Sequence, residues 1–409
     1  MTASASATRI LPCWIESFCD YTAGFQSPLI LRRWAAISAV AAAMERKVWV
    51  RTLGSEVYPN LYVILVAPPG TGKGMALNPI ESIYQKLDHL FLAPSSVTAP
   101  ALIDCLAEAK RRVIRLASIP PYLEFHSVYA ISSELSVLFP EYTTEMMSYL
   151  TDIYDCRQVP FKQRRRTKEV NIKIAAPQIN LFGATTPAQL GNFLPEGAWN
   201  QGFMSRVIMI YASDIIRPTL FREPPDFSKS ETNLTHDLKL ISEVVGKMEW
   251  DEDAKIAMEH WHQLGGPPTP QHMKLTHYCS RRTVHLLKLC MVSSMARGSS
   301  LNITLDDFAR AQNWLLEAED LMPDIFKSMA IGAGDSDAIE ETWQFVFKVY
   351  AREKKPILEH RLVAFLKERV PSASVMKVIE IMVRSKYMEM TPGEQGIMGY
   401  KPGEKTKQY

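Results

Sequence analysis

The sequence predicts a mixed α/β protein with a mainly parallel sheet, followed by a helical region and a small C-terminal domain. Short β-branched and apolar segments bounded by Pro or Gly alternate with helical segments over residues 51–215. Helical spacing continues without further strands over residues 216–335, and a different pattern fills residues 336–409. Strands that alternate with helices are typical of a parallel sheet whose two faces are covered by helices.

Composition and charge limit the class of protein. The 409 residues can form two to four packed units, and 47% apolar with 22% charged residues is typical of a soluble globular chain. The formal net charge of +2 means that any binding of nucleic acid depends on local basic patches. Six cysteines without a Cys-x-x-Cys pair suit a reducing compartment, so we expect a cytoplasmic protein.

The N-terminal region shows no pattern of a secretory signal or a membrane span. The opening "MTASASATRILPCWIE" lacks a cationic start followed by a long apolar core. The longest apolar run, "WAAISAVAAAM" at residues 34–44, lies between Arg33 and Glu45 and is too short to cross a bilayer. We therefore expect a buried helix at residues 34–44 and no contact with a membrane.

The alternating elements suggest four regions. Residues 1–50 are expected to form a helical N-terminal segment, and residues 51–215 a core. Residues 216–335 read as an all-helical lid domain that ends in the linker "IGAGDSD". Residues 336–409 contain three helix-like runs and a short hairpin, which is the pattern of a winged-helix domain.

Within the core, strands and helices are expected at specific segments. The expected strands are "KVWVRT", "LYVILVA", "SVYAISSEL", "EVNIKI", "QINLFGATTP" and "VIMIYA". One helix should follow the turn at residues 67–74, although Pro79 interrupts its early turns. A second is expected over "SSVTAPALIDCLAEAKRRV" with Thr98 as its N-cap, and a third over "TTEMMSYLTDIYD".

The segment "LYVILVAPPGTGKG" predicts a phosphate-binding loop. A loop of the form G/A-x-x-x-x-G-K-S/T presents backbone N–H groups and a helix N-terminus to phosphates, while its Lys reaches the β and γ oxygens. Ala67 to Gly74 match this form between an apolar strand and a helix, so we expect an α/β P-loop fold that binds ATP. The alternative is a Gly-rich turn with an exposed Lys. The expected phosphate contacts are Pro69, Gly70, Thr71, Gly72, Lys73 and Gly74.

Two positions depart from the pattern of a magnesium-dependent hydrolase. Gly74 lacks the hydroxyl that would bind Mg²⁺, a ligand that water can replace at some cost in affinity. Glu134, at the end of "VYAISSEL", is the candidate for activating water, and Ser133 stands before it where Asp is usual. We expect Ser133 and Glu134 to hold the metal weakly. The alternative for Glu134 is a surface carboxylate at a strand end.

Five further polar residues come later in the core and lid. Thr185 and Thr186 end a buried strand, where a hydroxyl could orient water beside the γ-phosphate or cap the next helix. Arg206 directly precedes the strand "VIMIYA", and a surface salt bridge would also explain it. Arg281 and Arg282 stand at the start of a lid helix, where either could be a solvated side chain.

Several motifs together resemble a known family. "YPNLYVILVAPPGTGKG", "ISSEL", "LFGATTP", "GFMSRVIMIYA" and "YCSRRTVHLLKL", in this order, look like the AAA+-like P-loop ATPases of phages and mobile elements classed as replicative DNA helicases. The Ser-Arg before a strand is also similar to the finger of the archaeal and eukaryotic minichromosome-maintenance helicases. The resemblance covers roughly residues 10–330.

The resemblance implies roles for individual residues. Lys73, Glu134 and Thr185 would act on ATP and Mg²⁺ in their own subunit, and Arg206 would be a finger on the nucleotide of the neighbouring subunit. Arg281 or Arg282 would be a second sensor contributed by the lid. The expected protein is a ring, as a hexamer, in the cytoplasm of a bacterial host, with a primase or a helicase loader as a further partner.

A basic segment lies between the expected Glu134 and Thr185 strands. If "FKQRRRTKEVNIKI" forms a hairpin, its basic tip could track a phosphate backbone in a central channel, preferentially of single-stranded DNA. The alternative is a solvated charged loop. Phe161 is the only nearby aromatic residue, so base stacking would be minor. The basic residues expected to contact nucleic acid are Lys162, Arg164, Arg165, Arg166, Lys168 and Lys173.

The last domain and the histidines give weaker indications. Lys377, Arg384 and Lys386 lie where a recognition helix would be, but Glu380 and Glu389 dilute their charge. A winged helix can also mediate protein contacts. The His and Cys residues between 260 and 290 match no zinc spacing, so we expect ordinary core and surface residues there.

These predictions lead to one function and two rivals. The sequence favours an ATP-hydrolysing, ring-forming motor that acts as a DNA helicase or translocase. The first rival is an ATP-driven switch, loader, packaging motor or defence ATPase that does not unwind DNA. The second is a degenerate nucleotide-binding scaffold, which Gly74 and Ser133 suggest.

Overall fold

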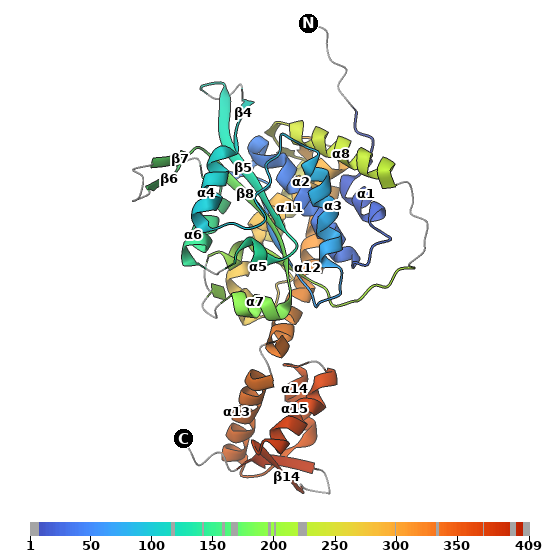
Figure 1. Ribbon diagram of the computed structural model, residues 1–409, viewed down its shortest axis with the longest axis vertical. Coiled ribbons are helices and arrows are strands. Elements are labelled where there is room, and N and C mark those ends of the chain that lie inside the picture. Colours follow the sequence, from blue (N-terminus) through green and yellow to red (C-terminus); the bar gives the residue numbers. More distant parts are fainter. Residues whose placement is uncertain are drawn as a thin grey trace. The chain divides into compact units, whose positions relative to one another are not determined.

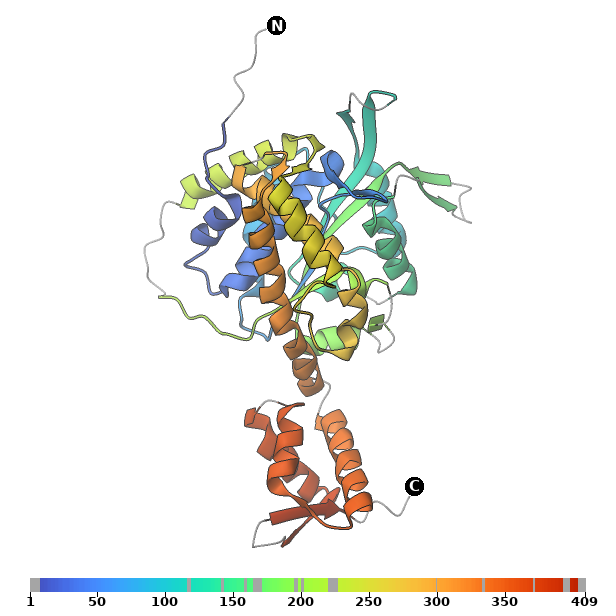
Figure 2. The same ribbon diagram turned by 180° about the vertical axis from the view of Figure 1, so that it is seen from behind.

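The computed structural model divides into two compact units. Unit 1 comprises Met1–Thr186 and Phe193–Met322, and unit 2 comprises Pro187–Asn192 and Pro323–Tyr409 (Figures 1 and 2). In the described part of the chain, no helix combines the length and the apolar character needed to cross a membrane. The structure describes residues 8–115, 119–140, 143–157, 160–164, 171–194, 198–199, 202–219, 227–298, 300–332, 335–370, 372–392 and 398–403.

The central sheet of unit 1 has five strands in the order β4-β5-β8-β3-β9. Every neighbouring pair is parallel except β4–β5, which is antiparallel. The predicted mixed α/β fold with a mainly parallel sheet is therefore confirmed. The strands are β3 (Tyr62–Val66), β4 (Lys110–Ile114), β5 (Tyr122–Ser132), β8 (Pro177–Thr185) and β9 (Val207–Tyr211).

Helices cover both faces of this sheet. Strands β3, β8 and β9 are buried at every residue, which requires a covered surface on either side. Both views show α4 (Ala99–Glu108) and α6 (Thr144–Tyr154) on one side and α2 (Leu29–Met44) and α3 (Lys73–Gln85) on the other (Figures 1 and 2). Helix α2 contacts β3, β8 and β9, and residues 34–44 are all buried, as predicted.

The helices expected to form a separate lid belong to unit 1 and pack on the N-terminal helices. Helix α8 (Phe227–Glu243) contacts both α1 (Trp14–Tyr21) and α2, and α11 (Arg282–Gly298) contacts the same pair. The Trp14 indole donates to the carbonyl of Leu234 at 2.8 Å. Asp237 accepts from the backbone N–H groups of residues 10 and 11, which fastens the N-terminal segment to α8.

Short elements complete unit 1. They include a small sheet in the order β10-β1-β2, a pair β11–β12 and a separate hairpin β6–β7. These elements are β1 (Val48–Arg51), β2 (Glu56–Val57), α5 (Leu135–Leu138), β6 (Phe161–Arg164), β7 (Asn171–Ile174), β10 (Gly246–Lys247), β11 (Glu249–Trp250), α9 (Glu252–Gln263), α10 (Thr276–Cys279), β12 (Asn302–Ile303) and the first part of α12 (Leu305–Gly332).

Three local predictions differ from the structure. Residues 216–335, expected to be all-helical, also contain the short strands β10, β11 and β12. Thr98 caps α4 by accepting from the Ala101 N–H, but the helix ends at Glu108 and residues 110–114 form β4 instead of a last turn. Pairing with β5 overrides the local helical pattern, because Lys110 and Arg112 both reach Glu124 across the ladder. The expected linker is short, since α12 runs to Gly332 and α13 begins at Asp335.

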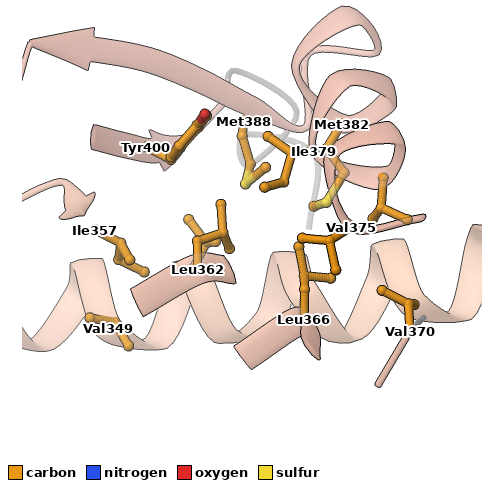
Figure 3. Close-up of a cluster of buried hydrophobic side chains, with 12 residues drawn as sticks. Val349, Ile357, Leu362, Leu366, Val370, Val375, Ile379, Met382, Met388 and Tyr400 are labelled. Carbon is orange, nitrogen blue, oxygen red and sulfur yellow. The ribbon is translucent and has the colours of Figure 1, made fainter. Parts of the chain in front are cut away.

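Unit 2 has its own apolar core, formed between helices and a three-stranded antiparallel sheet in the order β13-β15-β14 (Figure 3). Unit 2 also includes nearly all of α7 (Pro187–Phe193) and the last part of α12. The remaining elements are α13 (Asp335–Glu353), β13 (Ile357–Leu358), α14 (Glu359–Lys367), α15 (Ser372–Arg384), β14 (Met388–Pro392) and β15 (Met398–Pro402). The core residues include Val349, Ile357, Leu362, Leu366, Val375, Ile379, Met382, Met388 and Tyr400.

Candidate nucleotide and nucleic-acid sites

The turn between β3 and α3 has the backbone geometry of an anion cradle. Gly70 has φ 83° and Gly72 has φ 79°, a left-handed conformation that glycine adopts without strain. Helix α3 begins at Lys73, and its N-cap Gly72 supplies no side-chain cap. The first N–H groups of α3 therefore keep their capacity to bind an anion. Pro69 and Gly70 are exposed, so the cradle is accessible from solvent.

Gly72 is also required by a close approach of another segment. A Cβ on Gly72 would overlap the carbonyl oxygen of Gln26, in the turn between α1 and α2. The Gln26 side-chain amide donates to the Gly70 carbonyl at 3.3 Å. Thr71 is fully buried, and its hydroxyl donates to the carbonyl of Pro68. The N-terminal segment therefore holds the loop in shape.

The Lys73 ammonium bonds to the turn that precedes α3 and lies close enough to the Glu134 carboxylate to feel its charge. It donates to the backbone carbonyls of Ala67 at 2.7 Å and Pro68 at 3.1 Å. Burial lowers the pKa of Lys73, and the nearby negative charge of Glu134 opposes that shift. Because both hydrogen-bond acceptors are neutral carbonyls, a phosphate oxygen would be a stronger partner for this ammonium.

The two departures from the motif lie beside each other. Ser133 and Glu134 follow the last residue of β5, and Ser133 is exposed. The Glu134 backbone N–H and carbonyl both bond to the Ser132 hydroxyl, which fixes the turn after the strand. A Cβ on Gly74 would lie 3.9 Å from the Cβ of Ser133, an ordinary van der Waals contact. The structure thus brings Gly74, Ser133 and Lys73 to one place.

Thr185 ends β8 at the same edge of the sheet. It pairs in register with Val66, and its carbonyl accepts from the Ala67 N–H at 3.2 Å. The Thr185 hydroxyl donates to the carbonyl of the next residue, Thr186, at 3.4 Å, and Thr185 is 2% exposed. Lys73, Glu134 and Thr185 thus lie at or after the carboxyl ends of the parallel strands β3, β5 and β8, the side on which open α/β sheets bind ligands.

Arg206 lies at the opposite end of the strands from the turn at residues 67–74. It ends a 3₁₀ turn, Met204–Arg206, directly before β9. The first residue of β9 pairs with Tyr62, the first residue of β3, so Arg206 lies a full strand length from Lys73. At about 3.3 Å per residue, the length of β3 separates Arg206 from Lys73 by more than a single side chain can span.

Asp155 binds two of the candidate arginines at once. One carboxylate oxygen accepts from Arg206 at 2.7 Å and the other from Arg281 at 3.0 Å. Arg206 also donates to the Gly202 carbonyl, and its side chain is 7% exposed. Asp155 keeps its negative charge because these two arginines lower its pKa against the opposing effect of burial. Arg206 is therefore a buried ion-pair residue here and not a surface one.

Arg282 differs from its neighbour Arg281. Its guanidinium makes a bidentate pair with Glu319 at 2.7 and 2.6 Å and also donates to the carbonyls of Gly266 and Pro268. Both partners of the pair are about 97% buried. Arg282 is therefore a structural residue that joins α11 to α12, and of the two arginines only Arg281 is partly exposed.

The expected basic hairpin exists as β6 and β7. The two strands form a separate antiparallel pair in which Lys162 lies opposite Lys173 and Arg164 opposite Asn171. The Phe161 ring meets the Tyr149 ring edge-on at 5.5 Å, which attaches the hairpin to α6. Both views show the pair projecting from the rest of unit 1 (Figures 1 and 2). Arg165, Arg166 and Lys168 lie outside the described residues.

In unit 2, one of the basic residues expected to contact DNA is paired with a carboxylate. Arg384 pairs with Glu380 one helical turn earlier at 2.6 Å, and Lys386 follows α15 with φ 60°. Only the backbone of Lys377 is described. The described part of α15 therefore carries its exposed basic charge paired to a carboxylate.

Sequence reasoning missed three residues that shape these sites: Gln26, Asp155 and Lys288. Each acts through a contact with residues far away in the sequence, so no local pattern marks it. Lys288 is fully buried on α11, and its ammonium donates to both the backbone and side-chain oxygens of Asn60. Tyr154 and His285 extend this buried network through a 3.2 Å contact.

No cluster of three or more His, Cys, Asp or Glu residues that could hold a metal ion occurs within the described ranges. Mg²⁺ in nucleotide sites is bound through one or two protein ligands and the phosphates, so Glu134 fits that use with water in place of the missing hydroxyl. No protein-family model matches the chain, and no curated protein matches it. The function therefore has to be inferred from residues and geometry.

Proposed function

We propose that this protein is an ATP-hydrolysing P-loop motor of the AAA+-like class, most specifically a DNA helicase or translocase. The observation that carries the proposal is the position of Lys73. Its ammonium stands at an uncapped helix N-terminus behind a glycine turn, and Glu134 lies close enough to influence its pKa. A half-buried ammonium beside a helix N-terminus that has no side-chain cap favours a phosphate, and a nearby carboxylate is suited to activating water.

Assembly into a ring, as a hexamer, would explain the position of Arg206. This arginine cannot reach the nucleotide of its own chain, but an edge that faces a second copy would place it near that copy's γ-phosphate. Release from Asp155 is part of this proposal. Because Arg281 also pairs with Asp155, the carboxylate would keep one partner after Arg206 moves away.

The hairpin β6–β7 supports nucleic acid as the track. Lys162 and Lys173 are paired in register, and like-charged residues at paired positions are unfavourable in a ladder. A polyphosphate backbone would offset this repulsion, and single-stranded DNA is the form we propose. Unit 2, with three helices and a small antiparallel sheet, would be a winged-helix domain that adds a DNA or protein contact.

Steady-state ATPase with and without single-stranded DNA tests the proposal. We expect DNA to stimulate turnover, and Lys73→Ala and Glu134→Gln to abolish it, with Glu134→Gln still binding ATP. Turnover that ignores DNA would favour the first rival, a switch or loader. Nucleotide binding without turnover would favour a scaffold, the rival that Gly74 and Ser133 support.

The finger and the track need separate experiments. Mixing Arg206→Ala with Lys73→Ala subunits should restore part of the ATPase, since some interfaces would then combine an intact loop with an intact finger. No recovery at any ratio contradicts action between subunits. For the track, Lys162→Glu with Lys173→Glu should weaken DNA binding and reduce its dependence on salt. An unchanged salt slope would remove the hairpin from the DNA path.

A further inference from the structure

A small cavity beside Asp155 is separate from the proposed nucleotide site. It has a volume of about 210 Å³ and lies within unit 1. Three parts of the chain supply its wall: residues 55–60, the end of α6 with the two residues that follow, and the start of α11 with Arg281. Because these parts are far apart in sequence, only the folded chain forms the cavity. Its polar lining includes Tyr58, Asn60, Asp155, Arg281 and Lys288.

Lys288 places a buried ammonium at this cavity, and the hydrogen-bond acceptors of that ammonium are the neutral oxygens of Asn60. The residue is 2% exposed, and its ammonium donates to the two oxygens of Asn60 at 2.8 and 2.9 Å. It also lies 3.7 Å from the centre of the Tyr154 ring. Among the residues that the structure describes, no carboxylate pairs with this ammonium. A buried charge with only neutral partners is costly, so a counter-ion would stabilise it.

The nearby carboxylates are already used. Asp155 accepts from Arg206 and Arg281, so with Lys288 three cations share one negative charge. Glu56, which also lines the cavity, pairs with Arg115 at 2.5 Å and accepts from the Tyr58 hydroxyl at 2.6 Å. The cavity is therefore electropositive, and an anionic ligand would supply the missing charge.

We infer that this cavity binds a small tetrahedral oxyanion, of which inorganic phosphate is the representative, between the Lys288 ammonium and the Arg281 guanidinium. A guanidinium presents paired N–H donors that match phosphate oxygens, and an ammonium adds a point charge. The volume is below the roughly 300 Å³ at which pockets for whole organic ligands begin, which favours a free ion over a nucleotide. Binding of such an ion does not require ATP hydrolysis.

The charge of Lys288 should make the site pH-dependent. The pKa of Lys288 is lowered to about 7, chiefly by burial and also by Arg206 and Arg281, while Cys156 and Asp155 act in the opposite direction. His285, on the same helix, stays neutral because burial lowers its pKa to about 3. Sulfate keeps its charge across this range, so its affinity should fall as pH rises from 6 to 8 and Lys288 loses its proton.

The test measures binding of phosphate to the full chain by calorimetry in a Lys73→Ala background, which removes the ammonium of the proposed nucleotide site. We expect binding to persist in Lys73→Ala and to weaken at least tenfold when Arg281→Gln or Lys288→Gln is added. Lys255→Gln, an exposed lysine on α9, serves as the matched control and should change nothing. Circular dichroism checks that each variant is folded, and Arg281→Gln is the safer variant because its side chain is 30% exposed.

The outcomes separate this inference from the proposed function. If Lys73→Ala alone abolishes phosphate binding, or if neither cavity variant weakens it, the second site is refuted. If ATP binding is absent while phosphate binding depends on Arg281 and Lys288, the nucleotide proposal fails and the oxyanion site stands. A sulfate affinity that does not change between pH 6 and pH 8 would contradict the part assigned to Lys288.

Discussion

Gly74 and Ser133 face each other: a Cβ added to Gly74 would lie 3.9 Å from the Cβ of Ser133. They come from different elements, the first turn of α3 and the residue after β5. At Gly74 the chain lacks the hydroxyl, and at Ser133 the carboxylate, that a magnesium–nucleotide site would normally have. The two departures are therefore neighbours in the structure, although they come from different elements.

Restoring both groups should strengthen magnesium binding. We expect Gly74→Thr combined with Ser133→Asp to lower the Mg²⁺ concentration for half-maximal nucleotide binding by about tenfold, or roughly 1.4 kcal/mol, because a hydroxyl is added and a hydroxyl is replaced by a charged carboxylate. A Cβ at position 74 meets no atom closer than 3.9 Å, so the backbone there accepts a Cβ without overlap. Titration of nucleotide binding against Mg²⁺ measures the effect. Gly24→Thr, at a glycine with open space around it, is the control, and an unchanged Mg²⁺ dependence would contradict the assignment.

The two left-handed glycines of the loop should respond differently to alanine. Gly70 and Gly72 have nearly the same φ, but only Gly72 would place its Cβ against the backbone of Gln26. Gly70→Ala should cost about 1–2 kcal/mol of unfolding free energy, the strain of the left-handed conformation alone. Gly72→Ala should cost clearly more and weaken nucleotide binding. Urea unfolding of both variants checks this. Equal losses of unfolding free energy would mean that the backbone at residue 26 shifts at little cost to make room for the added Cβ.

Two aspartates on or next to α6 provide a matched pair. Asp155→Asn should lower the unfolding free energy by about 2 kcal/mol or more, since it leaves the buried Arg206 without its charged partner. Asp152→Asn should change it by less than about 0.5 kcal/mol, because Asp152 and its partner Arg157 are both largely exposed. Chemical denaturation of the two variants compares them. Similar values would show that Asp155 does not hold Arg206 in solution.

Arg281 and Arg282 should contribute differently to stability. Arg282→Gln breaks the buried bidentate pair with Glu319 and should cost about 3 kcal/mol or more, which thermal unfolding will detect. Arg281→Gln removes a partly exposed contact to Asp155 and should cost about 1 kcal/mol or less. Stability that falls more for Arg281→Gln than for Arg282→Gln would reverse the assignment.

His285 should make the protein less stable in mild acid. Burial lowers its pKa from 6.5 to about 3, so between these values the unfolded chain binds a proton at His285 and the folded chain does not. Unfolding free energy should therefore fall as pH decreases through this window, by up to about 1.4 kcal/mol per pH unit from this residue. His285→Gln should flatten the curve between pH 6 and pH 4. Parallel curves for wild type and variant would show that His285 is not buried neutral.

The sequence by itself determined the elements whose pattern is local. The alternation of apolar strands with helices gave the mixed α/β class, the Gly-rich turn marked the start of α3, and the apolar run at 34–44 gave the buried helix. Thr98 at an N-cap and the strands around the basic hairpin were also predictable. Each depends on residues within one or two turns of each other, so periodicity and turn chemistry are enough.

Only the tertiary structure decided the contacts between distant segments. Asp155 joins Arg206 and Arg281 across separations of 51 and 126 positions, and Arg282 pairs with Glu319 on another helix. Strand β4 replaced a helical turn because β5 offered a ladder, and the expected lid packed on α1 and α2. Burial and charge pairing are properties of the assembled fold, and one sequence does not reveal which distant side chains share them.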